Sequence, residues 1–183
     1  MKGFIRKNQC LSLCGLNCLL CPMYIGSYCP GCGGGEGNQS CKIAKCSLEN
    51  GNVEYCCQCT KYPCDKYEHI DEADSFITHQ NQKNNLDLIL KIGEEAYNNE
   101  QKEKQKLLEF FLLNCNDGRR KNLFCLGVNL LDLQSVKSIA EKIKNCPDFD
   151  NMPIKERAES TCKELKKAAK EKEIELKLRK PQK

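Results

Sequence analysis

The chain has 183 residues, 16 of them cysteine, and a formal net charge of +4 at pH 7. No apolar run approaches the roughly 18 residues of a membrane-spanning helix, and the basic start, Met1–Lys7, leads into a segment too interrupted for a secretory signal. We therefore expect a cytoplasmic protein outside the membrane. In that reducing compartment, closely spaced cysteines bind metal more often than they form disulfides.

Twelve of the cysteines lie in the first 64 residues, most of them in short, repeated spacings. Two thiolates a few residues apart can bind one tetrahedral metal ion from a tight turn, and two such pairs complete a four-sulfur site. The segment has few large apolar residues, so it needs metals or cross-links in order to fold. Ten cysteines form the regular set that we predict to bind metal: Cys14, Cys18, Cys21, Cys29, Cys32, Cys41, Cys46, Cys56, Cys59 and Cys64.

The predicted cofactors are two zinc ions, because neither histidine lies in the cysteine block and short cysteine turns are typical of zinc sites. An iron–sulfur cluster is the alternative, since it also takes four thiolates. The spacing of Cys14, Cys18 and Cys21 is that of radical S-adenosylmethionine enzymes, but the strand–helix units that those enzymes need do not follow. An interleaved grouping of the ligands and a choice between Cys56 and Cys57 stay open. The grouping that we favour keeps neighbouring pairs together: Cys29/Cys32 with Cys41/Cys46, and Cys18/Cys21 with Cys59/Cys64.

Residues 65–183 hold only four cysteines and show helical periodicity without strand-like alternation. The predicted fold class is mainly α, with a small irregular, zinc-knuckle-like module over 1–64 packed on a region of five or six helices over 65–183. The lysine-rich run from Lys163 to Lys183 alternates with glutamates, which predicts a solvated helix face rather than a nucleic-acid contact. Three of the predicted helices cover 65–76, 102–113 and 119–131. Another begins at Asn84 or Asn85 and reaches Tyr97, and a further one begins at Asp132 or Ser135. The last helix has Pro153 in its first turn and Asn151 as its cap.

One charged cluster outside the cysteine block draws attention, at Asp117-Gly-Arg-Arg120. It could bind a carboxylate or phosphate, but a helix–helix turn closed by local ion pairs is favoured. Lone cysteines such as Cys125 and Cys162 are typical of buried helix faces. We predict no catalytic residues and lean against an enzyme. An enzyme would centre on Asp117, Arg119 and Arg120 beside a thiol such as Cys125 or Cys57.

The cysteine block is similar to a bacterial and archaeal family catalogued as domain of unknown function 3795. The similarity covers residues 10–70 and rests on Cys14-Gly-Leu-Asn-Cys18-Leu-Leu-Cys21-Pro22, on Cys29-Pro-Gly-Cys32 and on Tyr62-Pro63-Cys64. It implies a zinc-binding domain and supplies no activity or substrate. We therefore expect a metal-binding protein of unknown biochemical activity, an interaction or regulatory adaptor for a protein partner. An iron–sulfur electron-transfer or redox protein is the alternative.

Overall fold

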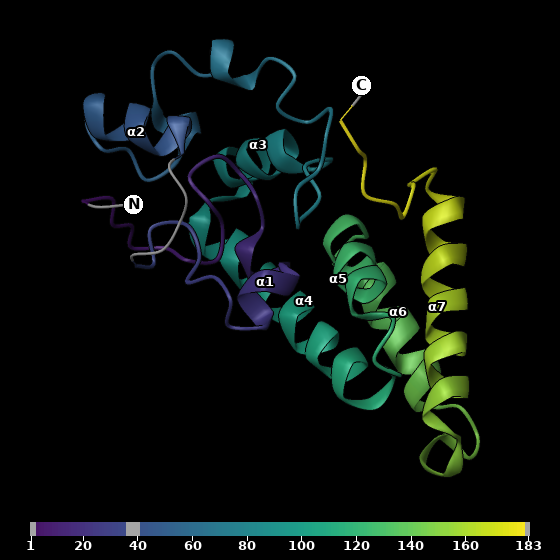
Figure 1. The fold of residues 1–183 in the computed structure, drawn as a ribbon. Coiled ribbons are helices and arrows are strands. Elements are labelled where there is room, and N and C mark those ends of the chain that lie inside the picture. Colours follow the sequence, from purple (N-terminus) through teal and green to yellow (C-terminus); the bar gives the residue numbers. More distant parts are fainter. Residues whose placement is uncertain (1–2, 36–40, 182–183) are drawn as a thin grey trace. The chain divides into compact units, whose positions relative to one another are not determined.

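The computed structural model describes residues 3–35 and 41–181 of the chain. Within these ranges the protein is mainly helical, with seven α-helices, four 3-10 turns and no strand (Figure 1). No helix in the described ranges is both long and apolar enough to cross a membrane. The chain divides into two compact units: the first comprises Met1–Gln101 with Leu178–Lys183, and the second comprises Lys102–Lys177.

The first unit is built from short helices joined by turns. Its main core contains Leu11, Tyr55, Tyr67, Leu86, Ile89 and Tyr97, and several cysteines pack against it. These core residues come from both sides of Cys64, so the compact unit extends beyond the boundary predicted there. Its elements are η1 (Cys18–Leu20), α1 (Pro22–Ile25), α2 (Lys42–Glu49), η2 (Cys56–Gln58), η3 (Asp65–Tyr67), α3 (Gln82–Ile92) and the first turns of α4 (Glu94–Asn114).

Two glycines let the cysteine loops approach other backbone closely. Gly15 has φ +97°, and a Cβ there would lie 2.2 Å from the carbonyl oxygen of Gln82 in α3. Gly33 has φ +79°, and a Cβ there would lie 2.9 Å from the backbone nitrogen of Arg6. Because L-residues rarely adopt such φ values, a side chain at either position would move the loop.

The C-terminal segment of the first unit is tied to residue 74. The backbone N–H of Arg179 donates to the Asp74 carboxylate at 2.7 Å, and the Arg179 guanidinium lies 3.2 Å from the same group. The N–H of Asp74 donates to the carbonyl oxygen of Arg179 at 2.9 Å in return. The Asp74 side chain is fully buried, so this clasp is shielded from water.

The second unit is a helical bundle, in which α5 (Lys121–Leu130) and α6 (Leu133–Lys144) both pack on α7 (Ile154–Glu171). The rest of α4 and the turn η4 (Phe149–Asn151) complete it. Gly127 lets α5 come close to α7, since a Cβ there would lie 3.2 Å from a methyl carbon of Leu165. The buried residues of α6 and α7 recur at helical spacing: Val136, Ile139, Ala140 and Ile143, then Ala158, Thr161, Cys162, Leu165 and Ala169.

The prediction of five or six helices after Cys64 is confirmed, since five α-helices follow it. The helix predicted over 65–76 is wrong: only the turn Asp65–Tyr67 forms, because Glu68 is extended with ψ 128° and His69 then takes a φ of +59°. The segment predicted to reach Tyr97 is broken by Gly93, whose φ is +85°.

Two predicted helix ends also differ from the structure. The last helix ends at Glu171, and residues 172–181 are turn, bend and irregular chain; Gln182 and Lys183, the end of the predicted run, lie outside the described residues. At its other end Pro153, not Asn151, holds the N-cap position. Asn151 belongs to the preceding 3-10 turn instead.

Candidate functional site

Two of the C-x2-C pairs form the same local turn. The N–H of Cys21 donates to the carbonyl oxygen of Cys18 at 3.0 Å across η1. The N–H of Cys59 donates to the carbonyl oxygen of Cys56 at 3.0 Å across η2. In a 3-10 turn, side chains three residues apart eclipse each other. Each turn therefore holds its two sulfurs on one side, as a four-sulfur metal site requires.

A first set of thiols gathers around Cys14; we call Cys14, Cys18, Cys32 and Cys41 the Cys14 group. Electrostatic interactions join Cys14 to Cys32 and Cys41, and Cys18 to Cys14 and Cys32. Burial raises the pKa of Cys14 to about 11 and that of Cys18 to about 12, because a thiolate without solvent is unfavourable. Backbone N–H groups oppose this effect: that of Leu16 bonds the Cys14 sulfur, and that of Cys32 bonds the Cys18 sulfur.

A second set lines a small cavity of about 40 Å³; we call Cys46, Cys56, Cys59 and Cys64 the Cys46 group. Burial raises the pKa of Cys56 to about 12, and the Tyr67 hydroxyl bonds its sulfur. The neighbouring Cys57 is not part of the cavity wall and lies near Asp87 of α3 instead. Between the two adjacent cysteines, Cys56 is thus the one that faces the other sulfurs.

These groups differ from the grouping favoured from the sequence. Cys41 lies with Cys14 and Cys32, whereas Cys46 lies with Cys59 and Cys64. The reason is helical geometry, because positions five residues apart in an α-helix point in directions roughly 140° apart. The α2 segment therefore presents one cysteine to each group, and the grouping of ligands into metal sites stays a prediction.

The predicted ligands, all of them among the described residues, lie near one another, but their sulfur atoms do not converge on a single metal position. Within the described ranges, no three His, Cys, Asp or Glu side chains are placed to hold a metal ion. All sixteen cysteines lie in these ranges, and none forms a disulfide. Of the remaining predicted ligands, Cys21 interacts with Cys18, and Cys29 is partly buried. His69 pairs with Glu72 at the surface, and His79 bonds Ser75 and a backbone carbonyl, so neither histidine joins the sulfurs.

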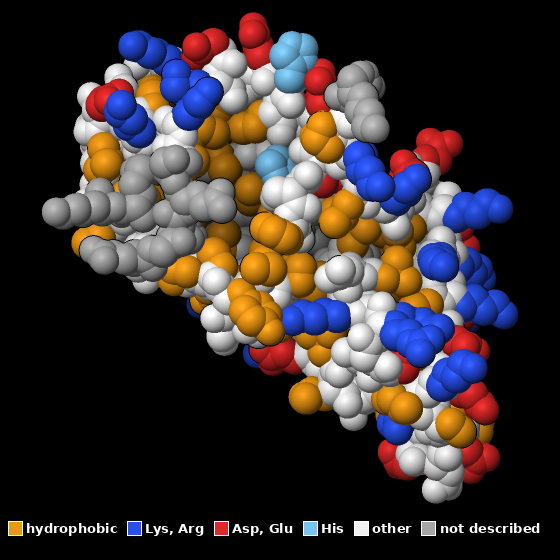
Figure 2. All heavy atoms as spheres, viewed as in Figure 1, with side chains coloured by type: hydrophobic (Ala, Val, Ile, Leu, Met, Phe, Trp, Pro, Cys, Tyr) orange, Lys and Arg blue, Asp and Glu red, His pale blue; other side chains and the backbone are white. Residues whose placement is uncertain are grey.

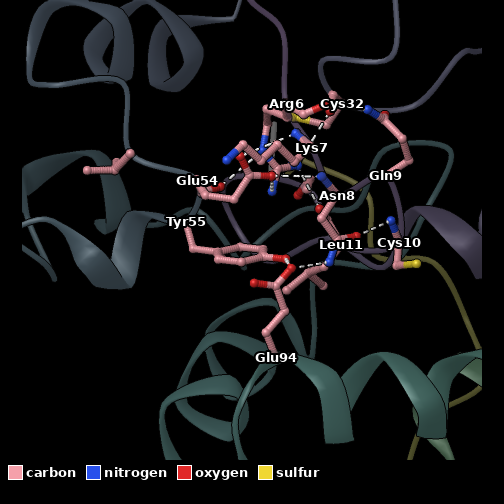
Figure 3. A network of polar contacts seen from close by, with 12 residues as sticks. Arg6, Lys7, Asn8, Gln9, Cys10, Leu11, Cys32, Glu54, Tyr55 and Glu94 are labelled. Atoms are coloured by element: carbon pink, nitrogen blue, oxygen red, sulfur yellow. Dashed lines mark hydrogen bonds and ion pairs between the residues drawn. The ribbon is translucent and has the colours of Figure 1, made fainter.

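A buried arginine stands beside the Cys14 group. The Arg6 guanidinium lies 3.3 Å from the Glu54 carboxylate, donates to the carbonyl oxygen of Leu11 at 2.7 Å and lies 5.1 Å from the centre of the Tyr55 ring (Figure 3). Burial raises the pKa of Cys32, and the Arg6 charge and hydrogen bond oppose that rise. Sequence analysis did not select Arg6, because its partner Glu54 lies 48 residues away.

The same network fixes the start of α4. Glu94 accepts hydrogen bonds from the Tyr55 hydroxyl at 2.9 Å and from the Asn8 side-chain amide at 2.7 Å (Figure 3). Burial, followed by the Glu94 carboxylate, raises the pKa of Tyr55, so the phenol remains a proton donor. The backbone around the Cys14 group is therefore held by buried polar contacts as well as by apolar packing.

Lysines surround the Cys46 group on its open side. An open groove of about 480 Å³ is lined by Cys46, Cys59 and Cys64 together with four lysines and two carboxylates: Lys42, Lys45, Lys61, Lys66, Glu49 and Asp65. The pKa of Lys66 is raised mainly by the Asp65 carboxylate, with smaller contributions from the Cys46 and Cys64 sulfurs. A divalent ion with four thiolates has a net charge of about −2, which nearby ammonium groups stabilise.

In the second unit, Asp117 closes a turn as predicted. It accepts the N–H of Arg119 at 3.1 Å and pairs with the Arg120 guanidinium, which also lies 3.6 Å from Glu159 of α7. The surface beside this turn is hollowed into an open groove of about 570 Å³. The thiol in the groove wall is Cys162, not Cys125 or Cys57. Cys125 and Cys162 are both buried, as predicted.

Comparisons with protein-family models, with curated proteins and with solved structures find no match for this chain. The similarity of the cysteine block to domain of unknown function 3795 therefore stays a prediction, and the function must be argued from the site itself.

Proposed function

We propose that the first unit is a metal-binding module in which the Cys14 group and the Cys46 group each bind one zinc ion through thiolates. The observation that carries the proposal is the convergence of four sulfurs from α2, η2 and the segment before η3 on one cavity. Its volume of about 40 Å³ exceeds the roughly 10–15 Å³ that one water-sized guest needs, so it has room for an ion.

The surrounding charges support the same proposal. Metal binding requires thiolates, and a buried thiol loses its proton only where a cation compensates. Arg6 beside Cys32 and Lys66 beside Cys46 and Cys64 add to the positive charge that an ion would bring.

The role of the zinc would be structural. Four thiolates leave no open position for a substrate, and metal binding then contributes directly to the free energy of folding. The segment that holds the ligands has short helices and few buried apolar residues of its own, as α1 illustrates with none. We propose that the stabilised module serves as an interaction or regulatory adaptor, and the lysines around the Cys46 group favour an acidic protein partner.

Metal analysis of cysteine variants tests the assignment. Protein purified without oxygen should contain two zinc ions per chain, and Cys46→Ser or Cys56→Ser should each lose about one of them. Cys57→Ser is the matched control, because the structure places Cys57 outside the cavity; it should keep both ions.

Two outcomes would contradict the proposal. Brown protein with iron, sulfide and absorbance near roughly 400 nm would replace zinc by the iron–sulfur alternative. Loss of metal from Cys57→Ser but not from Cys56→Ser would show that the group is wrongly assigned.

A further inference from the structure

The groove of the second unit is strongly cationic. It lies where the start of α5 faces α7, and the view in Figure 2 shows many Lys and Arg side chains over α7. Leu123 supplies an apolar part of the wall. The charged residues that line the groove are four cations and one carboxylate: Arg119, Arg120, Lys163, Lys166 and Glu159.

Within the part of the chain that the structure describes, three of these cations have no ion pair, unlike several other lysines of this unit. Lys167 of α7 lies 4.0 Å from Glu171, and Lys172, which follows α7, lies 2.9 Å from Asp132. Among the ion pairs of the described residues, Arg119, Lys163 and Lys166 have no carboxylate partner. Their positive charge is therefore not used by the fold, and it is concentrated at one concave surface.

The start of α5 adds to this potential. Its N-cap residue, Arg120, provides no side-chain acceptor for the N–H groups of the first turn. Unbonded N–H groups at a helix N-terminus attract anions. Arg120 itself is already paired with Asp117 and Glu159, so it shapes the groove while the other cations remain available to a ligand.

We propose that this groove binds a small phosphomonoester, with Arg119, Lys163 and Lys166 contacting the phosphate and Leu123 contacting the attached organic group. A dianion fits an excess of positive charge better than a carboxylate does, and guanidinium groups match phosphate oxygens in pairs. The volume of about 570 Å³ is in the range of small-molecule sites, roughly 300–1,000 Å³. This site is independent of the metal-binding function proposed for the first unit.

Calorimetric and NMR titration at constant ionic strength tests the proposal, with phenyl phosphate as the probe. Phenyl phosphate should bind saturably and shift the amide signals of Cys162 and Leu123, inorganic phosphate should bind more weakly, and benzoate should not exceed chloride. The double variant Lys163→Ala/Lys166→Ala should weaken phenyl phosphate about five- to tenfold, from two lost charge contacts. Arg119→Ala should weaken it as well.

The matched control is Lys155→Ala/Lys167→Ala, which removes the same charge from exposed positions of the same helix outside the groove. It should leave the affinity within about twofold, because only screened, distant charge is lost. Equal weakening by both double variants would show a non-specific charge effect and overturn the proposal. Absence of saturable binding, or benzoate binding as tightly as phenyl phosphate, would also overturn it. Unchanged melting temperatures for the variants would confirm that they fold.

Discussion

Along α6 and α7 of the second unit, buried residues return every three or four positions, and the side chains that fill the core are almost all apolar. In the first unit α1 buries no residue, α2 buries only Ala44 and Ser47, and cysteines and polar side chains hold much of the structure. One chain thus combines a bundle that burial of apolar surface can stabilise with a unit in which cysteines, Arg6 and Asp74 pack beside the apolar core. The two units should therefore respond differently to the same treatments.

Removing the proposed zinc ions should separate the responses of the two units most strongly. We expect a strong chelator to unfold much of the first unit while the second keeps its helices, since structural zinc contributes on the order of 10 kcal/mol to the folding of small modules. Hydrogen exchange measured segment by segment should show lost protection around both cysteine groups and retained protection in 121–171. Equal loss in both units, or none in either, would contradict the division of roles.

Truncating Leu165 should destabilise the second unit and leave the first unit unchanged. This side chain is fully buried on α7 and lies against Gly127 of α5, so Leu165→Ala should cost about 2–5 kcal/mol of unfolding free energy. Denaturant unfolding of the second unit would measure the loss, and the metal content should not change. Ile154→Ala on the same helix is the control: its side chain is 40% exposed, and it should cost about 1 kcal/mol or less.

The two units also differ in how far sequence alone could predict them. The α6 stripe and its cap are local, because Asp132 bonds the N–H of Ser135 three residues away and the apolar spacing follows from the helix itself. In the first unit the decisive contacts are distant: Asp74 meets Arg179 across 105 positions. No local sequence pattern predicts such a pair.

The cysteine groups fall between these cases. The set of ligands could be proposed from spacing, because each C-x2-C turn is a local structure. Their partition could not, since it depends on α2 being helical between Cys41 and Cys46, which turns the two sulfurs apart. The groove was missed for a similar reason: Arg119 and Lys163 are brought together only by the packing of α5 on α7.

Neutralising the buried carboxylate of the first unit should have an intermediate effect that depends on pH. Burial alone would raise the pKa of Asp74, but the N–H groups of Arg179 and His79 and the Arg179 guanidinium hold it below the usual 3.8. Asp74→Asn should cost about 1.5–3 kcal/mol at neutral pH, as expected for charge-assisted hydrogen bonds. A carboxylate whose pKa is lower in the folded than in the unfolded protein stabilises the fold at pH values above its unfolded pKa. This stabilisation is lost as the pH falls through its folded pKa.

The difference in stability between wild type and Asp74→Asn should therefore be constant at neutral pH and shrink below about pH 4. Unfolding of the two proteins at several pH values would measure it. A difference that grew on acidification would show that the carboxylate does not stabilise the clasp as a charged group. Arg179→Ala should reproduce only part of the loss, because the backbone N–H of residue 179 still donates to Asp74.

The smallest effect should come from the exposed carboxylate of the second unit, where one residue makes two separable contributions. Asp132 caps α6 by accepting the N–H of Ser135 at 2.9 Å, and it lies 2.9 Å from the ammonium group of Lys172 with about half of its side chain exposed. Asp132→Ala removes both and should cost about 1 kcal/mol. Asp132→Asn keeps the cap, since asparagine caps as well as aspartate, and should cost only about 0.2–1 kcal/mol for the solvent-exposed ion pair.

Thermal unfolding in low and high salt would separate the two, because salt should weaken the Asn effect and leave the rest of the Ala effect in place. If Asn proved as damaging as Ala, the ion pair rather than the cap would stabilise this helix, and the contrast with the shielded Asp74 would be lost.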